Sequence, residues 1–375
     1  MSRQERSVRH VDRESDPTAT PDPAPDGASV LGSVHAYNEN QWNNLVTHAD
    51  QGTLFPRHEW LAAVEEGLDR DPRHVVVNTD SNPVALMPNF VQPFQPPLDA
   101  ATAVSDALGL GVMKSADVGF GGPIVARNEA ETVERLFDAL EATISQRILY
   151  HRISTYHPGH VRYGQYLESR GYEAKADLAT FLIDLSMDWE TILETMDRSR
   201  RKDVRRAHEQ EYRVEIGPLD EDIRRTHEMY AKNTERVGGT VKDFSFFRAL
   251  QDRLPERVRV FTAVVDGETV GRYVYLLDRE NDTLHHWLSA IPDRDCYSFY
   301  PAELMHSRAI KWGIEQGFEE YSFGRAGAHF DNGVFRFKSQ YGAEPVRVLR
   351  WERGPNPLVW PAFKYGRRLV TRRES

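Results

Sequence analysis

The sequence predicts an α/β (α+β) fold of two tandem units, each a mixed, mainly antiparallel sheet flanked by helices. Its 375 residues exceed one average domain and allow two, each able to bury its own core. Both halves also repeat one order of elements. Each has one or two helices, a strand, a tight turn, a strand, a further extended segment, a long helix and another strand. The final step across the long helix predicts one parallel strand pair in each sheet.

Composition narrows the class of protein. The chain carries 57 acidic and 47 basic residues, a net charge of −10. This argues against a protein that coats nucleic acid, although it leaves room for a local basic groove. The single cysteine, Cys296, excludes an internal disulfide and any cysteine-based metal site. No apolar run reaches the ~18 residues of a membrane span, and the N-terminus lacks the apolar region of a signal peptide. We therefore expect a cytoplasmic protein.

The first half divides into a tail and a folded unit. Residues 1–30 are charged and Pro-rich, so they cannot bury enough apolar area to fold, and a disordered tail is expected. The first unit is placed at residues 31–185. Its expected elements are helices at 41–46 and 56–67, strands at 74–78 and 84–91, an ambiguous segment at 101–110, a tight turn at Gly119–Pro123, a long helix at 129–146, a strand at 149–155, a short helix at 163–170 and a strand at 180–185.

The second unit is placed at residues 186–352. Asp188 is a good N-cap, and Trp189, Ile192, Leu193 and Met196 come after it at helical spacing. We predict that this helix continues unbroken into the basic run 198–207. The other expected elements are a strand at 213–216, a helix capped by Asp220, a helix after Asp243, strands at 258–265, 269–277 and 284–290, a Pro-started helix at 301–316, and strands at 320–323 and 346–351. Residues 353–375 form a basic tail.

The segment 321–345 is the strongest candidate for chemistry. Its glycines, at 324, 327, 333 and 342, let the backbone approach a ligand or take positive φ. Between them lie cations and aromatics: Arg325, Phe330, Phe335, Arg336, Phe337, Lys338 and Tyr341. Most positive charges of this chain are arginines, so lysine at 338 is an informative choice, because lysine is a compact charge that can titrate. The alternative is a structural loop whose aromatics pack on the sheet.

Several local sequences occur in a characteristic order. They are R-S-R-R-K-D-V-R-R-A at 198–207 before a V-E-I strand, F-F-R-A-L at 246–250, the hairpin V-V-D-G-E-T-V-G-R-Y-V-Y at 264–275, A-I-K-W-G-I-E-Q-G leading into Y-S-F-G-R, and G-V-F-R-F-K-S-Q-Y-G at 333–342. Each of these motifs is weakly specific by itself. As an ordered series over roughly 34–351, they resemble the FemAB-like acyltransferase family, which doubles the GNAT fold.

The resemblance implies transfer of an acyl or aminoacyl group to an amine. The co-substrate would be acyl-CoA or aminoacyl-tRNA, with no bound cofactor, and the acceptor a small molecule or a glycan or peptide precursor of the cell surface. The family's lysine in the F-K segment, which stabilises developing negative charge, falls on Lys338. The chain departs from the acetyl-CoA enzymes because Arg325-Ala326-Gly327-Ala328 is a poor imitation of their pyrophosphate loop.

Amide formation from an ester or thioester requires a neutral amine, a group that takes its proton, and donors for the oxyanion. The catalytic candidates are Lys338 as a charge, Asp293 or alternatively Glu303 as a proton acceptor, and Tyr300 or alternatively Tyr297 as a side chain that lines the acceptor site. The alternative is that 289–301 is an ordinary loop with capping polar groups. The residues expected to bind donor or acceptor are Arg325, Gly327, Arg336, Phe337, Tyr341, Trp287, Arg201, Lys202 and Arg205. The cluster 198–206 grips phosphates in one interpretation and is a solvated helix face in the other.

Two further features keep alternatives open. His285 and His286 are adjacent on a strand, so they point to opposite faces, cannot chelate one metal, and are expected as core or surface histidines. The basic tail is an interfacial segment for peripheral membrane contact, a flexible tail, or a segment docked on the first unit. The leading hypothesis is an N-acyltransferase. The others are a peptidoglycan-bridge-type transferase that uses aminoacyl-tRNA, and a non-catalytic GNAT-like binding protein. No DNA partner is expected.

Overall fold

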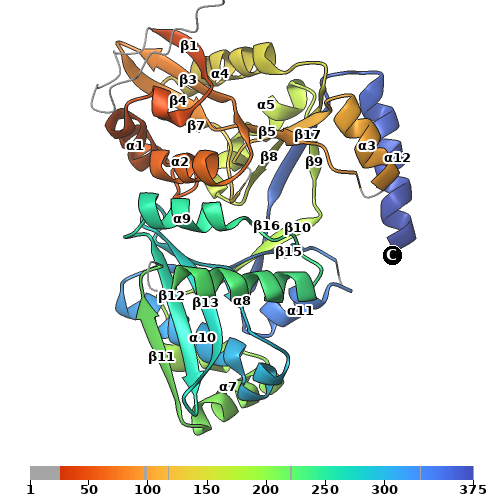
Figure 1. Cartoon of the computed structure of the whole chain (residues 1–375). Helices are drawn as coiled ribbons and strands as arrows, with labels where there is room; N and C mark the ends of the chain where they lie inside the picture. The colour runs from red at the N-terminus through yellow and green to blue at the C-terminus, as the bar shows by residue number, and fades with distance from the viewer. Residues whose placement is uncertain (1–25, 97–98, 117, 220–221, 330, 375) are drawn as a thin grey trace, which may run out of the picture.

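The computed structural model describes residues 26–96, 99–116, 118–219, 222–329 and 331–374. Two units are stacked on each other, the first at the top of Figure 1 and the second at the bottom. The described strands form three sheets of four, six and seven strands. The predicted α/β architecture of two units with mixed sheets and flanking helices is confirmed.

The first unit holds the two smaller sheets. The four-stranded sheet has the order β1 (Gly27–Leu31), β3 (His74–Thr79), β4 (Asn82–Met87), β7 (Ile124–Val125). The six-stranded sheet has the order β2 (Asp71–Pro72), β5 (Phe90–Pro93), β6 (Gly111–Lys114), β8 (Ile148–Thr155), β17 (Leu349–Arg353), β9 (Glu173–Lys175). Its helices are α1 (Glu39–His48), α2 (His58–Gly67), α3 (Asp99–Ala107), α4 (Glu129–Thr143) and α5 (Gly164–Ser169). The expected parallel step is the β6–β8 pair.

The second unit is one sheet between two helical layers. Its order is β11 (Tyr212–Gly217), β12 (Val258–Val265), β13 (Glu268–Asp278), β14 (Thr283–Ala290), β15 (Glu320–Gly327), β10 (Leu178–Asp184), β16 (Glu344–Arg347). One face packs on α6 (Trp189–Thr195), α7 (Arg198–Glu209) and α10 (Pro301–Glu315). The other face packs on α8 (Ile223–Arg236) and α9 (Phe244–Arg253). The parallel step here is β14–β15.

The two sheets exchange strands across the predicted boundary at residue 185. Strand β10 pairs with β15 and β16 of the second unit, although it precedes that unit in sequence. In the other direction, β17 pairs with β8 and β9 of the first unit. The single strand predicted at 346–351 is therefore two strands, β16 and β17, in different sheets. Backbone pairing in both directions ties the units together.

Other local predictions need correction. Residues 1–25 lie outside the described residues, but Gly27–Leu31 pairs with β3 as β1, so the predicted disordered tail does not extend to residue 30. The strand predicted at 84–91 is divided between β4 and β5. The predicted cap Asp220 is also outside the described residues, and α8 begins after Asp222.

The helix predicted to run unbroken from 189 into the basic run is interrupted. Met196 and Asp197 have extended backbone, with ψ of 147° and 145°, and separate α6 from α7. The N–H of Asp197 donates to the carbonyl of Gln340 at 2.9 Å. A tertiary hydrogen bond thus replaces a helical one at this point, and apolar spacing alone does not reveal such a bond.

The basic tail contains α12 (Val359–Glu374), which docks on the first unit beside α3 (Figure 1). The indole of Trp360 is 7% exposed and packs near Tyr150. Lys364 pairs with Glu173, and Arg367 donates to Glu352 at 2.6 Å. Of the three interpretations of this tail, the docked one describes the structure. No helix in the described residues is long and apolar enough to cross a membrane.

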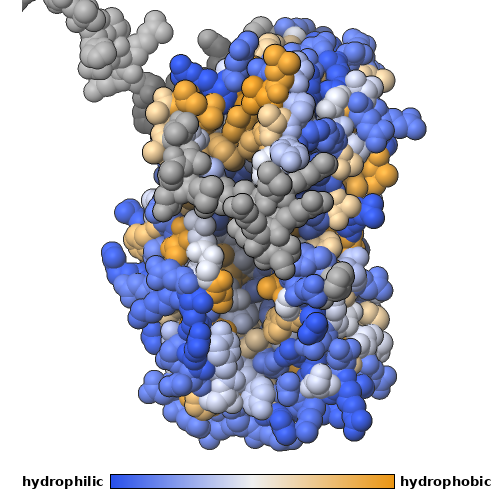
Figure 2. Space-filling model, turned by 90° about the vertical axis from the view of Figure 1, so that its right-hand side faces the viewer, coloured by the Kyte–Doolittle hydropathy of each residue, from blue (hydrophilic) through white to orange (hydrophobic). Residues whose placement is uncertain are grey.

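The units meet through a shared apolar core. Helix α2 lies against α9, and a Cβ added at Gly67 would come within 2.4 Å of the Phe246 backbone, so only glycine permits this approach. The Trp60 ring lies 6.2 Å from Phe246 and 6.0 Å from Trp287. The face in Figure 2 is mostly hydrophilic, with larger hydrophobic patches over the first unit.

Candidate active site between the two units

The parallel strands β14 and β15 diverge and leave an opening in the second sheet. They pair only from Thr283 to His285 on β14 and from Glu320 to Ser322 on β15. A cleft of about 470 Å³ lies where they separate. The second unit lines it with β14, β15, α8 and Lys338, and the first unit with Phe55 and Val118–Phe120. The cleft is thus completed by both units.

Lys338 borders this cleft from a short helix, α11 (Gly333–Ser339), rather than from a loop. The Asn332 side chain caps the helix by accepting from the Phe335 N–H. The Lys338 side chain is 9% exposed, and its Nζ donates to the Arg325 carbonyl at 2.8 Å. Burial, and then the charge of Arg325, lower the pKa of Lys338 to about 7. Near neutral pH the amine is therefore present in both charged and neutral forms.

Helix α11 is held in place by Arg200 of α7. The guanidinium lies over the Phe337 ring at 4.8 Å and the Tyr341 ring at 4.7 Å. It also forms an ion pair with buried Glu303 and donates to Gln340 Oε1 at 3.0 Å. Burial raises the pKa of Glu303 even though the charge of Arg200 opposes that shift. Phe337 and Tyr341, predicted as binding residues, belong to this support behind Lys338.

Two neutral imidazoles lie on the helix side of the cleft. His286 is half-buried near Lys338, and desolvation followed by the lysine charge lowers its pKa to about 3. Its Nε2 is 3.0 Å from Ser289 Oγ. His306 is fully buried, with Nδ1 2.6 Å from the Tyr321 hydroxyl, and burial also holds its pKa well below the usual value. Both rings therefore stay uncharged beside the lysine.

A β-bulge at Trp287 forms part of the β14 wall. In the β13–β14 register Val274 faces Leu288 and Tyr275 faces His286, so Trp287 is the additional residue. A bulge takes a peptide group out of regular ladder pairing and redirects it. Trp287 was predicted to bind a ligand, and it lines the cleft. Its ring is also part of the packing between the units, 5.7 Å from Phe246.

The other predicted residues are distributed over several places. Arg325 lines the cleft, with its guanidinium 5.0 Å from the Phe120 ring centre. Gly327 ends β15 beside Asn332, and Arg336 is exposed on α11. Asp293 and Tyr300 do not line the cleft. The exposed Asp293 carboxylate accepts from the N–H groups of residues 295 and 296, which lower its pKa, and Tyr300 begins α10 with φ of 53°.

Arg201, Lys202 and Arg205 form a separate site on α7. With Arg198 they line a hollow of about 410 Å³. Lys202 and Arg205 are exposed. Four cations around one hollow match the chemistry of a phosphate chain, but they lie outside the cleft that contains Lys338.

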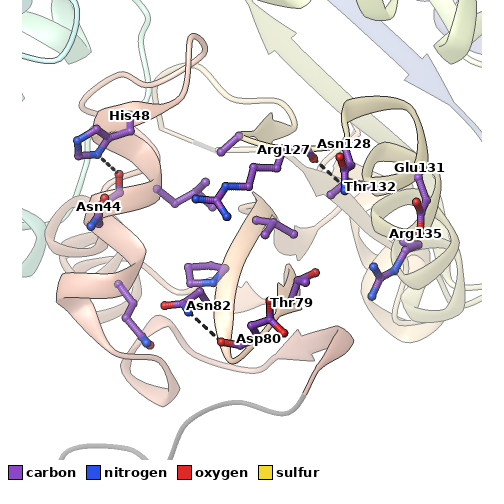
Figure 3. A pocket seen from close by; sticks show the side chains of 15 residues that line it. Asn44, His48, Thr79, Asp80, Asn82, Arg127, Asn128, Glu131, Thr132 and Arg135 are labelled. Carbon is purple, nitrogen blue, oxygen red and sulfur yellow. Dashed lines mark hydrogen bonds between the residues drawn. The ribbon is translucent and has the colours of Figure 1, made fainter.

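A larger hollow of about 720 Å³ lies on the first unit (Figure 3). Its walls are α1, the β3–β4 turn and the start of α4, and Arg127 points into it from the loop before α4. Its lining mixes apolar residues such as Leu45 and Val84 with charges of both signs, Asp80 and Glu131 as well as Arg127 and Arg135. None of the residues predicted for the site lies there. We therefore place the candidate active site in the cleft between the units.

Several cleft residues were not predicted as functional. Phe55 and Phe120 come from the first unit, and Asn233 comes from α8. The two histidines of β14 do point to opposite faces, as predicted, with His285 5.3 Å from Phe55 and His286 5.0 Å from Tyr273. Both nevertheless border the cleft, because the opening between β14 and β15 gives access from either face.

Comparisons with known proteins agree with this architecture. Residues 195–339 match the model of the acetyltransferase (GNAT) domain. This match contains α7, the diverging strands and Lys338. No match to a curated protein sequence was found.

Solved structures of similar fold cover nearly the whole chain. FemX superposes with a TM-score of 0.64 at 14% identity, over 88% of this chain and 98% of that one. L-PGS from Bacillus licheniformis gives 0.53 at 12%, over 92% and 99%. A tandem GNAT protein from the clavulanic acid biosynthesis pathway gives 0.52 at 12%, over 88% and 98%. These likenesses concern the fold alone: the chain is similar in its two-unit architecture to FemX and to the tandem GNAT protein, and the GNAT domain match lies in its second unit.

Proposed function

Because the chain carries a GNAT domain within a FemAB-like fold, we propose that it is an N-acyltransferase that transfers an acyl or aminoacyl group to an amine in the cleft between its units. The observation that carries this proposal is Lys338, a nearly buried lysine beside the opening between the two parallel strands. A cation in a site of low dielectric stabilises a developing oxyanion far more than one in water.

In this proposal the acyl group lies between β14 and β15. Protonated Lys338 and the peptide groups of the bulge at Trp287 act on the carbonyl oxygen as it gains negative charge. Arg325, at the same mouth, binds an anionic part of the donor or acceptor. Phe55 and Phe120 of the first unit close the cleft over the reacting groups, which excludes water that would hydrolyse the donor.

The donor is tested by thermal unfolding with acetyl-CoA, longer acyl-CoAs and aminoacyl-tRNA, because a ligand that binds only the folded state raises the melting temperature. With the donor that stabilises, Lys338→Ala should lower turnover on an amine acceptor by about 10²–10³-fold, the effect of losing one oxyanion donor. Lys232→Ala, at an exposed lysine of α8 that lines neither the cleft nor the basic hollow, serves as the control on turnover. A folded Lys338→Ala protein with unchanged turnover contradicts the role of Lys338.

The basic hollow on α7 favours a second form of the function, in which the donor is aminoacyl-tRNA. Four cations at Arg198, Arg201, Lys202 and Arg205 offer a phosphate-binding surface on the same unit as Lys338. This version predicts tRNA binding that weakens with salt, and that weakens again when Arg201 and Arg205 are changed to alanine. Charged tRNA that binds without salt dependence, or not at all, removes this version. If no donor supports turnover, a GNAT-like binding protein is the remaining hypothesis.

A further inference from the structure

Buried polar side chains gather behind the His285 wall of the cleft. Asp278, at the end of β13, is 0% exposed, and neither of its carboxylate oxygens has a hydrogen-bond partner within the described structure. His285 is 4% exposed, and its Nε2 lies 3.6 Å from Asp278 Oδ2. That separation is too long for a hydrogen bond, so Nε2 also lacks a partner among the described residues.

The first unit adds a third group of this kind. Tyr156 is 7% exposed, and its buried hydroxyl makes no hydrogen bond of good geometry among the described residues, although Thr283 and Asn281 lie near enough to lower its pKa. Native structures pair nine-tenths or more of their buried polar groups. Three unpaired groups at one junction, one of them a carboxylate, therefore call for an explanation beyond packing. Small movements that close the 3.6 Å gap between Asp278 and His285 would satisfy both side chains together.

His285 connects this group to the cleft. Its ring packs against Phe55 and is part of the cleft lining, while Nε2 faces Asp278. The contact with Asp278 leaves Nδ1 as the ring nitrogen available to a substrate. A buried carboxylate behind an imidazole that borders a substrate cavity is an arrangement that makes histidine an effective base, because the carboxylate orients the ring and stabilises the imidazolium.

The proposed reaction needs such a base. An acceptor amine is largely protonated near neutral pH, and it must lose a proton to attack a carbonyl. Lys338 donates its hydrogen bond to Arg325 and is assigned to the oxyanion. His286 is a weak base with Nε2 next to Ser289 Oγ, and the predicted acceptor Asp293 does not line the cleft. Tyr230 and Lys242 also line the cleft. Burial raises the pKa of the Tyr230 phenol, and lysine is ordinarily charged near neutral pH, so neither is suited to accept a proton. His285 is the remaining candidate base.

We infer that His285 accepts the proton of the acceptor amine and that Asp278 is its positioning residue, an inference that rests on the proposed acyl transfer. The acceptor ammonium first releases one proton to water. The neutral amine then attacks, and as the C–N bond forms, its second proton moves to His285 Nδ1. The bond between the carbonyl carbon and the donor oxygen or sulfur then breaks, and its electron pair leaves with that atom. The imidazolium returns its proton to the leaving atom, so no net charge accumulates at His285.

Other titratable groups face this pair. Tyr156 and His157 approach from the loop after β8, and Glu320 approaches from β15. Burial, and then Asp278, raise the pKa of Tyr156, so its hydroxyl stays protonated and able to donate. Burial also raises the pKa of Glu320, against the opposing effect of His285. Only the imidazole must change its charge during each turnover.

The test is the pH profile of kcat/KM for the wild type, His285→Gln and Asp278→Asn. The acid limb reports a base that must be neutral, whereas Lys338 must be charged and so produces the alkaline limb. His285→Gln should lower kcat/KM by about 10²–10⁴-fold and abolish the acid limb. Asp278→Asn should lower it at least ~10-fold and move the acid limb to lower pH, because the lost carboxylate favours the imidazolium. His48→Gln, on the surface of the first unit, is the matched control.

A readout without turnover separates this inference from the proposed function. The ring signals of His285, identified by their loss in His285→Gln, are titrated by NMR in the wild type and in Asp278→Asn. A lower pKa in Asp278→Asn supports the pair even if no acyl donor is found. The inference is overturned if that pKa does not move, if His285→Gln stays folded with kcat/KM within about twofold of wild type, or if Asp278→Asn loses activity without a shift of the acid limb.

Discussion

The parallel strand pairs of the two units differ in how the chain continues beyond them. In the first unit β6 and β8 pair from Gly111 with Ile148 to Lys114 with Arg152, and the chain then returns to close the gap. Gly121 bridges to Ser154 on β8, and the Phe120 ring lies 4.6 Å from Tyr156. In the second unit β14 and β15 separate after three residue pairs, and the opening remains as the cleft.

The difference shows that the parallel step alone does not create a site. Strand divergence offers a site only where the chain leaves the opening clear and supplies a charge, as α11 does with Lys338. In the first unit the segment Gly119–Gly122 takes that space, and its glycines allow it to fit. A Cβ at Gly119, where φ is 104°, would lie 2.1 Å from Phe55 Cδ1, and one at Gly122 would lie 2.6 Å from His160 Nε2.

The prediction with the largest expected effect concerns how tightly the segment Gly119–Gly122 fills the space beyond the β6–β8 pair. Gly119→Ala should lower the free energy of unfolding by about 3 kcal/mol or more, because positive φ and crowding against Phe55 both oppose a side chain. Gly267→Ala is the matched control, since Gly267 has φ of 84° but no atom within 4 Å of an added Cβ. The free energy of unfolding of Gly267→Ala should fall by only about 1–2 kcal/mol, because this variant has the strain of a positive φ but no crowding. Equal losses in urea unfolding would mean that the segment is loosely packed.

The next prediction concerns how much the charge of nearly buried Lys338 lowers the stability of the folded protein. The folded-state pKa of Lys338, about 7, lies below its usual 10.5, so the fold disfavours the charged lysine. Below pH 7 both folded and unfolded chains carry the charge, and Lys338→Met should stabilise the protein by about 2–3 kcal/mol. As pH rises from 7 to 10.5 the wild type recovers stability, so the gain should shrink. Urea unfolding at about pH 6 and about pH 10 checks this, with exposed Lys202→Met as control. A gain that does not depend on pH would show that the lysine is not destabilised by its charge.

Local signals explain which parts of the fold could be predicted. The hairpin between β12 and β13 is predicted by Asp266–Gly267 between two apolar strands, and α10 by Pro301 and Gly317 at its ends. Lys338 was singled out because a lysine is unusual in this Arg-rich chain and lies in a glycine-spaced segment. That choice could be made without knowing that the residue is on a helix or nearly buried.

The remaining features depend on contacts between distant residues. The exchange of β10 and β17 between sheets, and the break before α7, arise from pairing partners far away in sequence. The Asp278–His285 pair requires the β13–β14 register, and Phe120 reaches the cleft from the other unit. Asp293 lies outside the cleft, which its sequence does not reveal, because a loop carboxylate that caps its own turn looks the same in sequence as a proton acceptor.

The smallest effect concerns α12, which gives the first unit a further layer that the second unit does not share. Lys364 and Glu173 are both partly exposed, with 23% and 38% of their side chains accessible, so Lys364→Ala should cost less than about 1 kcal/mol. The loss should shrink in high salt, because screening weakens such a pair. A double-mutant cycle with Glu173→Gln measures the coupling, and Trp360→Ala supplies the contrast, since burial of the indole should contribute about 3 kcal/mol or more. If the ion pair contributes more to the free energy of unfolding than Trp360 does, charge rather than apolar contact holds α12 on the first unit. In that case, high salt should release the tail.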